Sequence, residues 1–443
     1  MIVPRHVLGG QGYTAPSEKI TLAGIGIGGI GHPQLKQARE AGFEIVALCD
    51  IDDQFAQKTY DAFPQARRYR DFRELIASEG DKADAVYCGT PDHTHAIITL
   101  AALKAKKHVC CVKPLTRTIE ECRVVGEASR KAGVATQVTA RSNTSETACR
   151  ITEWIGAGII GEVREVHSWS SRPVWPQGMV AYPDFSAAIP KHFDWSQWLG
   201  PAEKRPYADV WPKNFPYPEM SLNWTGRAVF HPFNFRGWTA FGTGSLGDMG
   251  CHRANTVYRA LKLRYPTRVA VTCTRKYEMS FPLGCIATYD YPARAGFPEL
   301  RYIWYDGGLR PPAPKQLAGK PLPIEGTLYV GDKGIILEDA AQAEKPPLIL
   351  DAALAVKAES IPKQLVRRGG TMPEWLEACK GKGPAGCDFE WAVPLTEFVL
   401  LGNLAMQTGK SVEFNPDTLR IANNPEAEAL IRQPYHNGWA LTA

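Results

Sequence analysis

The sequence predicts an α/β region built on a doubly wound parallel sheet, followed by an α+β region with a mixed or antiparallel sheet. Three observations predict this. Apolar strand-like runs alternate with helical patterns up to about residue 140, a segment rich in Trp, Pro and Tyr then interrupts the alternation, and short strand-like runs return after it. We therefore expect two domains, residues 1–140 and 141–443.

The first region carries the clearest periodicity. Residues 1–18 are rich in Gly, Pro and polar residues, so we expect them to form an arm. Continuous apolar runs are typical of strands buried on both faces of a parallel sheet. The expected strands are residues 19–26, 44–50, 83–89, 108–112 and 134–139, and the expected helices are 34–41, 71–78, 95–105 and 119–132.

The second region is less regular. Residues 172–238 hold many Pro residues, which break both helices and sheet ladders, and a loop of this length is usually functional. Short connections between the later strands favour antiparallel or mixed pairing. The expected strands are 162–170, 269–274, 285–291, 301–305 and 326–330, and the expected helices are 145–157, 373–379 and 389–408.

Composition excludes several function classes. The chain has 443 residues and a formal net charge of +5, with no dense block of Lys or Arg, so we expect no nucleic-acid partner. No apolar run approaches the ~18 residues of a membrane span. The 11 cysteines lie mostly in strand-like runs, which favours buried thiols, although Cys379 and Cys387 could pair. The modest positive net charge fits a small neutral or anionic ligand.

A glycine motif follows the first strand. Residues 26–31 read G-x-G-x-x-G, in which Gly26 permits a tight turn, Gly28 lets the backbone approach a pyrophosphate, and Gly31 allows close packing of helix on strand. The following helix offers N–H groups to the phosphates. This arrangement predicts a dinucleotide-binding Rossmann fold, with Gly29 and Ile30 also at the cofactor. A glycine-rich turn without a ligand is the alternative.

The second strand ends in Asp50, about 20 residues after the glycines, where an acid binds the ribose hydroxyls of the cofactor. Such an acid repels a 2′-phosphate and therefore favours NAD over NADP. It could instead be an ordinary carboxylate at a strand end.

A Thr-Pro-Asp-His-Thr-His segment at residues 90–95 follows the third strand, at the sheet edge where ligands bind. We expect cofactor contacts from Thr90, Pro91, His93 and His95, and a further one from Gln137. The two histidines could equally cap a helix or lie in a solvated turn.

Several motifs together resemble the Gfo/Idh/MocA family, the glucose-fructose oxidoreductase and inositol dehydrogenase group. They are the glycine motif, the segment 90–95 with Val-Lys-Pro-Leu-Thr at 112–116, and Gly-Ser-Leu-Gly-Asp-Met-Gly-Cys-His at 244–252. The resemblance extends to the Gly438-Trp439 ending. It is greatest to a bacterial branch with stretches similar to residues 172–178 and 231–238. That branch often carries a twin-arginine export signal ahead of a segment like residues 2–10, so localisation stays open.

The resemblance implies a catalytic centre. Lys113 occupies the place of the family's catalytic lysine, preceded by Val112 where the family has Glu. Asp248 and His252 correspond to the family's Asp-x-x-x-His pair and would share one helix face. We expect His252 to be the acid/base, Asp248 to orient it or bind a substrate hydroxyl, and Lys113 to stabilise alkoxide charge. A helix cap with a satisfied histidine is the alternative, and we expect no metal site.

The aromatic segment is the expected sugar surface. Tryptophans can stack on the apolar faces of pyranose rings, and arginines can bind hydroxyls or a carboxylate. Candidates are Arg172, Trp175, Arg236 and Trp238, with Trp195, Trp198 and Trp224 as weaker ones. The alternative is that these aromatic residues pack the loop or a subunit interface.

These residues lead us to expect an NAD-dependent oxidoreductase that transfers a hydride between nicotinamide and a secondary hydroxyl of a sugar or glycoside. Two alternatives stay open: redox-neutral glycoside cleavage through a transient keto sugar, and a non-catalytic NAD-dependent sensor, which Val112 supports best. The resemblance also implies a homodimer or homotetramer.

Overall fold

A six-stranded parallel sheet organises the first region. The computed structural model describes residues 19–212, 226–341 and 345–442. The strands run in the order β3-β2-β1-β4-β5-β6, all parallel, which confirms the expected Rossmann arrangement. They are β1 (Thr21–Ile25), β2 (Glu44–Cys49), β3 (Arg67–Tyr69), β4 (Ala85–Cys88), β5 (His108–Cys111) and β6 (Thr136–Val138).

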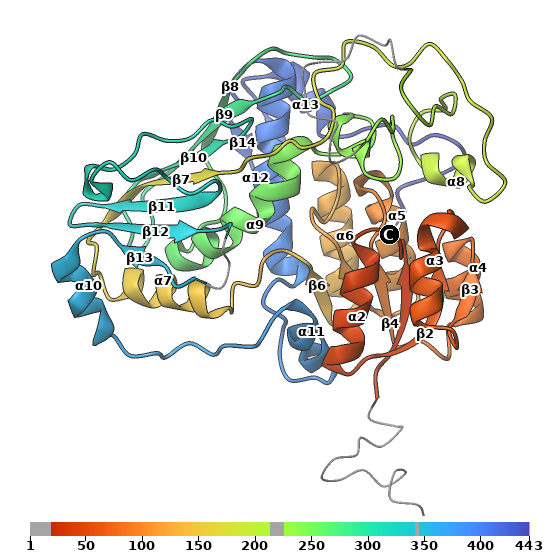
Figure 1. Cartoon of the computed structure of the whole chain (residues 1–443), viewed down its shortest axis with the longest axis horizontal. Helices are drawn as coiled ribbons and strands as arrows, with labels where there is room; N and C mark the ends of the chain where they lie inside the picture. Colours follow the sequence, from red (N-terminus) through yellow and green to blue (C-terminus); the bar gives the residue numbers. More distant parts are fainter. Residues whose placement is uncertain (1–18, 213–225, 342–344, 443) are drawn as a thin grey trace, which may run out of the picture.

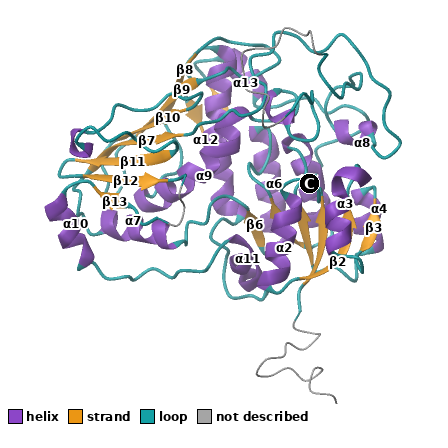
Figure 2. Ribbon diagram, viewed as in Figure 1, coloured by secondary structure: helices purple, strands orange, loops and turns teal. Residues whose placement is uncertain are grey.

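Helices cover both faces of this sheet because alternate strand residues point to opposite sides (Figure 2). Cys111 packs into a core with α4 to α6, whereas Cys110 packs into another with α2, α3 and α11. α6 begins at a reciprocal Thr118/Glu121 capping box and ends at Gly133, whose φ is +65°. The helices are α2 (Gly31–Ala41), α3 (Asp53–Ala62), α4 (Phe72–Ser78), α5 (His95–Lys104), α6 (Ile119–Ala132) and α11 (Thr371–Cys379).

A seven-stranded mixed sheet organises the second region, in the order β13-β12-β11-β7-β10-β9-β8. Only the β7–β10 pair among these described strands is parallel, so the expectation of a mixed sheet is confirmed. The strands are β7 (Val163–Trp169), β8 (Arg268–Cys273), β9 (Cys285–Tyr291), β10 (Leu300–Tyr305), β11 (Gly326–Gly331), β12 (Ile335–Asp339) and β13 (Leu348–Ile349).

Two long helices lie between the sheets, α9 (Gly244–Leu261) and α12 (Phe389–Thr408) (Figure 1). α12 begins at the capping carboxylate of Asp388 and is buried along almost its whole length, because it packs on α6 and β6 on one side and on α9 and β8 on the other. The remaining elements are α7 (Glu146–Gly156), α8 (Trp195–Leu199), α10 (Ala352–Glu359), α13 (Pro425–Leu430), β14 (Phe414–Asn415) and β15 (Arg420–Ile421), with short 3₁₀ turns at Asp92–Thr94, Asn234–Gly237 and Lys315–Leu317.

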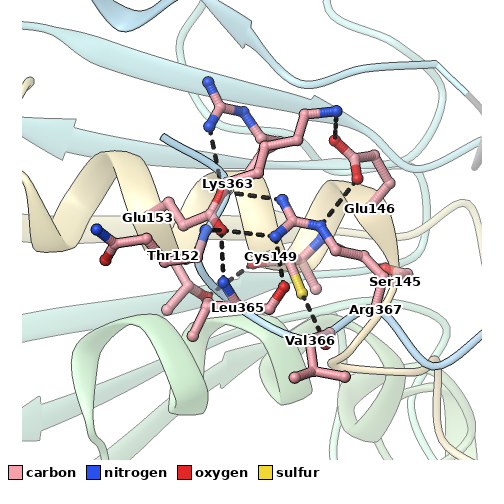
Figure 3. A network of polar contacts seen from close by, with 12 residues as sticks. Ser145, Glu146, Cys149, Thr152, Glu153, Lys363, Leu365, Val366 and Arg367 are labelled. Atoms are coloured by element: carbon pink, nitrogen blue, oxygen red, sulfur yellow. Dashed lines mark hydrogen bonds and ion pairs between the residues drawn. The ribbon is translucent and has the colours of Figure 1, made fainter. Parts of the chain in front are cut away.

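An ion-pair network fastens the connection that leads back from the second sheet to α11 (Figure 3). Arg367 bridges Glu146 and Glu153 of α7, and Glu153 also accepts the N–H groups of Gln364 and Leu365. Burial alone would raise the pKa of Glu153, but Arg367 and these N–H groups outweigh it and lower that pKa to about 2. The network is satisfied internally, so its role is to hold this connection against α7.

Most expected elements are confirmed to within a few residues, but others were missed. The sequence analysis did not identify the 18-residue helix α9 or the 10-residue helix α3, nor several short elements, among them β3, β12 and α10. All 11 cysteines are free thiols, including Cys379 and Cys387, so the possible pair between those two is not formed. Within the described ranges, no helix combines the length and apolarity that a membrane crossing requires. The expected arm at 1–18 lies outside the described residues, and the boundary at residue 140 stays a prediction.

Candidate active site

One cavity runs along the carboxyl ends of the first sheet and continues to the N-terminal half of α9. This is the edge at which open α/β sheets bind ligands. Its walls come from the glycine loop, from the ends of β2, β4 and β5, from the aromatic segment and from the last residues of the chain. Among the lining residues are Gly26, Gly28, Gly29, Ile30, Asp50, Thr90, Pro91, Lys113, Arg172, Arg236, Asp248 and His252.

The glycine loop has the backbone geometry that its sequence predicts. Gly26 has a φ of +71°, and a Cβ there would lie 2.6 Å from the amide nitrogen of Thr90. A Cβ on Gly31 would lie 2.4 Å from the carbonyl oxygen of Gly26, so this glycine allows the close packing expected of it while lying outside the cavity lining. No side chain caps α2 at Ile30, but the Gly31 N–H is bonded to the Gly28 carbonyl at 2.8 Å and Pro33 has no N–H, so the first turn offers an anion at most the His32 N–H. The loop therefore fits a pyrophosphate.

Asp50 ties the end of β2 to this loop. Its Oδ2 accepts the N–H groups of Ile27 at 2.9 Å and Gly28 at 3.0 Å, and its Oδ1 accepts that of Asp52 at 3.0 Å. Burial raises the pKa of Asp50, although these N–H groups act in the opposite direction. A carboxylate oxygen has two acceptor positions, so the side chain can still accept ribose hydroxyls at the cavity.

Three expected cofactor contacts lie away from the cavity. The two ring nitrogens of His93 face the carbonyl oxygens of Phe241 and Trp198, and those of His95 face the carbonyl oxygens of Pro114 and Thr90. A neutral ring donates to one of its two carbonyls. Gln137 donates to the carbonyl of Thr371 and accepts the N–H of Cys387. All three side chains are fully buried, so they position the surrounding loops instead of facing a ligand.

Lys113, Asp248 and Arg236 form one charged group at the far end of the cavity. The Lys113 ammonium and, at 3.2 Å, the Nε of Arg236 donate to the same oxygen of Asp248. Burial would raise the pKa of Asp248, but the two cations outweigh it and hold that pKa well below its usual range. Asp248 therefore supplies Lys113 with a carboxylate partner although residue 112 is valine.

His252 lies one helical turn after Asp248 and is oriented by the main chain. Its Nδ1 accepts the N–H of Arg141 at 2.9 Å, so in the neutral ring the hydrogen lies on Nε2. Burial, followed by the charge of Lys113, lowers the pKa of His252 well below its ordinary value. The expected orientation of His252 by Asp248 is therefore corrected, because Asp248 bonds Lys113 and Arg236 while Arg141 holds the ring.

The tryptophans expected to bind sugar instead pack the aromatic segment. Trp175 donates to the side chain of Gln177 and Trp238 to the carbonyl of Val229, and both rings are fully buried away from the cavity. Trp195 likewise lies in the segment's own core. Trp198 does line the cavity, whereas Trp224 lies outside the described residues.

Several lining residues were not predicted. His231 bonds Asp52 at 3.0 Å and contacts the edge of the Phe55 ring, which lies over Gly28 and Gly29. The motif at 231–238 was recognised as part of the resemblance, and that motif was the available signal for His231. Trp439 also lines the cavity and lies in the Gly438-Trp439 ending that the resemblance included, whereas no local pattern indicated Phe55, a further lining residue.

Residues 20–140 match the model of an oxidoreductase family with an NAD-binding Rossmann fold, Gfo/Idh/MocA. The NAD-binding domain of this chain belongs to the Gfo/Idh/MocA family. Among curated relatives, inositol 2-dehydrogenase of Salmonella paratyphi B is 33% identical over 147 residues, which are 32% of this chain and 43% of that enzyme. A 1-carboxy-3-chloro-3,4-dihydroxycyclohexa-1,5-diene dehydrogenase of Comamonas testosteroni is 31% identical over 125 residues, 28% of this chain and 31% of that enzyme. The match thus spans less than half the length of these relatives.

Solved structures extend the likeness of fold to both regions. The WlbA dehydrogenase of Bordetella pertussis, solved with NADH and UDP-GlcNAcA, has a TM-score of 0.61 at 14% identity and covers 90% of this chain and 99% of its own. The aldose-aldose oxidoreductase of Caulobacter crescentus, solved with glycerol, has a TM-score of 0.57 at 17% identity and covers 89% and 100%. At these identities the likeness concerns the fold alone.

Proposed function

We propose that this protein is an NAD-dependent oxidoreductase that transfers a hydride between nicotinamide and a secondary hydroxyl of a sugar or sugar derivative. One observation carries the proposal: Lys113, Asp248 and His252 line the same cavity as the glycine loop. The relatives named as inositol dehydrogenases and the sugar-linked structural neighbours support the substrate class. The carboxylate of Asp50 supports NAD over NADP, because it would repel a 2′-phosphate.

The proton chemistry is assigned to Lys113. Oxidation of a secondary alcohol requires a hydride to leave the carbinol carbon and a proton to leave its oxygen. Nicotinamide, when bound, supplies the hydride acceptor. His252 has Nδ1 engaged by the Arg141 N–H, so its Nε2–H can donate to the substrate oxygen but cannot take a proton from it. Lys113 would first release a proton to water; its amine would then accept the hydroxyl proton, and the resulting ammonium would return that proton in reduction.

Asp248 and Arg236 have positioning roles in this assignment. The Asp248 carboxylate holds the Lys113 side chain in place. Arg236 is fixed by Asp248 and by the Phe233 carbonyl, and its guanidinium lies 4.3 Å from the centre of the Phe233 ring and 4.6 Å from that of Phe235. Such a fixed guanidinium can bind a hydroxyl or a carboxylate of the substrate.

The test is turnover of a panel of sugars, sugar acids and glycosides by the purified protein with NAD. We expect NADH and a keto product in equal amounts. Release of a free sugar from glycosides without net NADH would instead establish the redox-neutral alternative. Bound NAD with no turnover across the panel would favour the sensor. Failure to bind NAD would overturn the proposal.

A further inference from the structure

The last residues of the chain return to the nucleotide-binding sheet. After α13 the chain crosses from the helices beside the second sheet to the region of α4 and α5 (Figure 1). Asn437 donates its side-chain amide to the carbonyls of Gly200 and Ala202, and the His436 N–H donates to that of Pro201. The Tyr435 hydroxyl donates to Glu121 of α6. The C-terminal segment is therefore anchored at several points and not merely laid on the surface.

This anchoring places Trp439 in the wall of the cavity. Its indole is half-buried and stacks on Phe72, with the ring centres 5.8 Å apart and the planes 18° from parallel. The Arg73 guanidinium lies 5.1 Å from the centre of the indole. Trp439 and Phe72 both line the cavity that contains the glycine loop. An aromatic wall is thus built from two segments more than 300 residues apart.

The wall lies at a particular end of that cavity. Phe72 begins α4, directly after the edge strand β3, and β3 pairs with β2, which ends beside Asp50. An acid at the end of β2 marks the ribose of the adenosine half of a dinucleotide. Lys113 follows β5, on the other side of β1. Trp439 is therefore on the adenosine side of the glycine loop, away from the catalytic group.

We infer that Trp439 is an adenine-binding residue and that the C-terminal segment completes the adenosine subsite of the cofactor. The inference rests on the proposed function, since it requires a bound dinucleotide. Flat aromatic surfaces bind nucleobases by stacking, whatever hydrogen-bond pattern the base carries. Trp439 is already held against Phe72 and Arg73, so its side chain loses little freedom when a base stacks on it.

The experiment compares the affinities of NAD, 5′-AMP and nicotinamide mononucleotide for wild-type protein and two variants by isothermal titration, after removal of co-purified nucleotide. We expect Trp439→Ala to raise the Kd of both NAD and AMP by about 5- to 100-fold, with the Kd of nicotinamide mononucleotide unchanged. Trp439→Phe keeps a stacking ring and should restore most of the loss, even if the alanine variant is less stable.

Trp154→Ala is the matched control. Trp154 is also half-buried, and the Arg150 guanidinium also lies 5.1 Å from its ring centre, but it sits on α7 outside the cavity. Trp154→Ala should leave the Kd values of NAD, AMP and nicotinamide mononucleotide unchanged. Unchanged NAD and AMP affinities in Trp439→Ala, or an equal loss for nicotinamide mononucleotide, would overturn the inference while leaving the proposed function intact. A wild-type protein that binds neither NAD nor AMP would overturn both.

Discussion

Replacement of Asp248 by asparagine tests the charged group at the centre of the site. The change keeps the shape of the side chain, removes its charge and replaces one acceptor oxygen by an NH2 group. Lys113 and Arg236 donate to the same oxygen of Asp248, so the variant leaves two cations together without a carboxylate. The Lys113 and Asp248 side chains are only 15% and 11% exposed, so water screens the unpaired charges poorly.

The expected cost follows from that burial. Removing one partner of a buried ion pair destabilises a protein by about 3–5 kcal/mol, and the retained amide oxygen offsets part of it, which leaves about 2–3 kcal/mol. Turnover should fall by about 100-fold or more, because a displacement of the reacting amine by 1 Å is enough for such a loss. The affinity for NAD should change little, since the glycine loop and Asp50 are untouched.

The assay is urea denaturation of Asp248→Asn beside turnover and NAD titration. Glu390→Gln is the control, because its ion pair with Arg130 is more than half exposed on both sides and should contribute less than about 1 kcal/mol. Equal stability losses in the two variants, or full turnover in Asp248→Asn, would refute the account of this group.

Three further changes probe other parts of the structure. His252→Gln keeps a side-chain N–H donor and should retain measurable turnover, whereas His252→Ala should lose about 100-fold with NAD affinity unchanged; equal rates in both would contradict the donor role. Gly26→Ala should abolish NAD binding, measured by titration, because its Cβ would meet the Thr90 backbone at a φ of +71°. Burial lowers the pKa of His93 to about 3, so between pH ~6.5 and ~4.5 only the unfolded state takes up a proton at this residue. The free energy of unfolding of wild type, measured by urea denaturation, should therefore fall by about 1.4 kcal/mol per pH unit relative to that of His93→Gln over this range. Parallel pH curves would contradict that neutral state.

The features that the sequence predicted best are local ones. The glycine spacing and Asp50 lie within a single strand–helix–strand unit, so their relative positions follow from the chain itself. The pairing of Lys113 with Asp248 joins residues 135 positions apart, and only the family resemblance suggested it.

The missed and corrected residues depend on tertiary contacts. Trp175 and Trp238 have the right chemistry for sugar stacking, but both are fully buried. Trp238 belongs to the core of the Pro-rich segment, and the Trp175 indole is bonded to Gln177. Trp439 reaches the cavity because hydrogen bonds from Asn437 hold the C-terminal segment back against residues 200–202. Hydrophobic periodicity in the sequence does not predict such contacts. The tautomer of His252 depends on a single N–H from Arg141, more than 100 residues away.

The most direct test of the central claim is single-turnover hydride transfer by Lys113→Met, with an accepted substrate and saturating NAD, followed through NADH formation. The account predicts that wild type forms NADH and keto product together, while the variant binds NAD with the same Kd and forms NADH at least about 1,000-fold more slowly. NADH formation at the wild-type rate in this variant would contradict the assignment of proton transfer to residue 113.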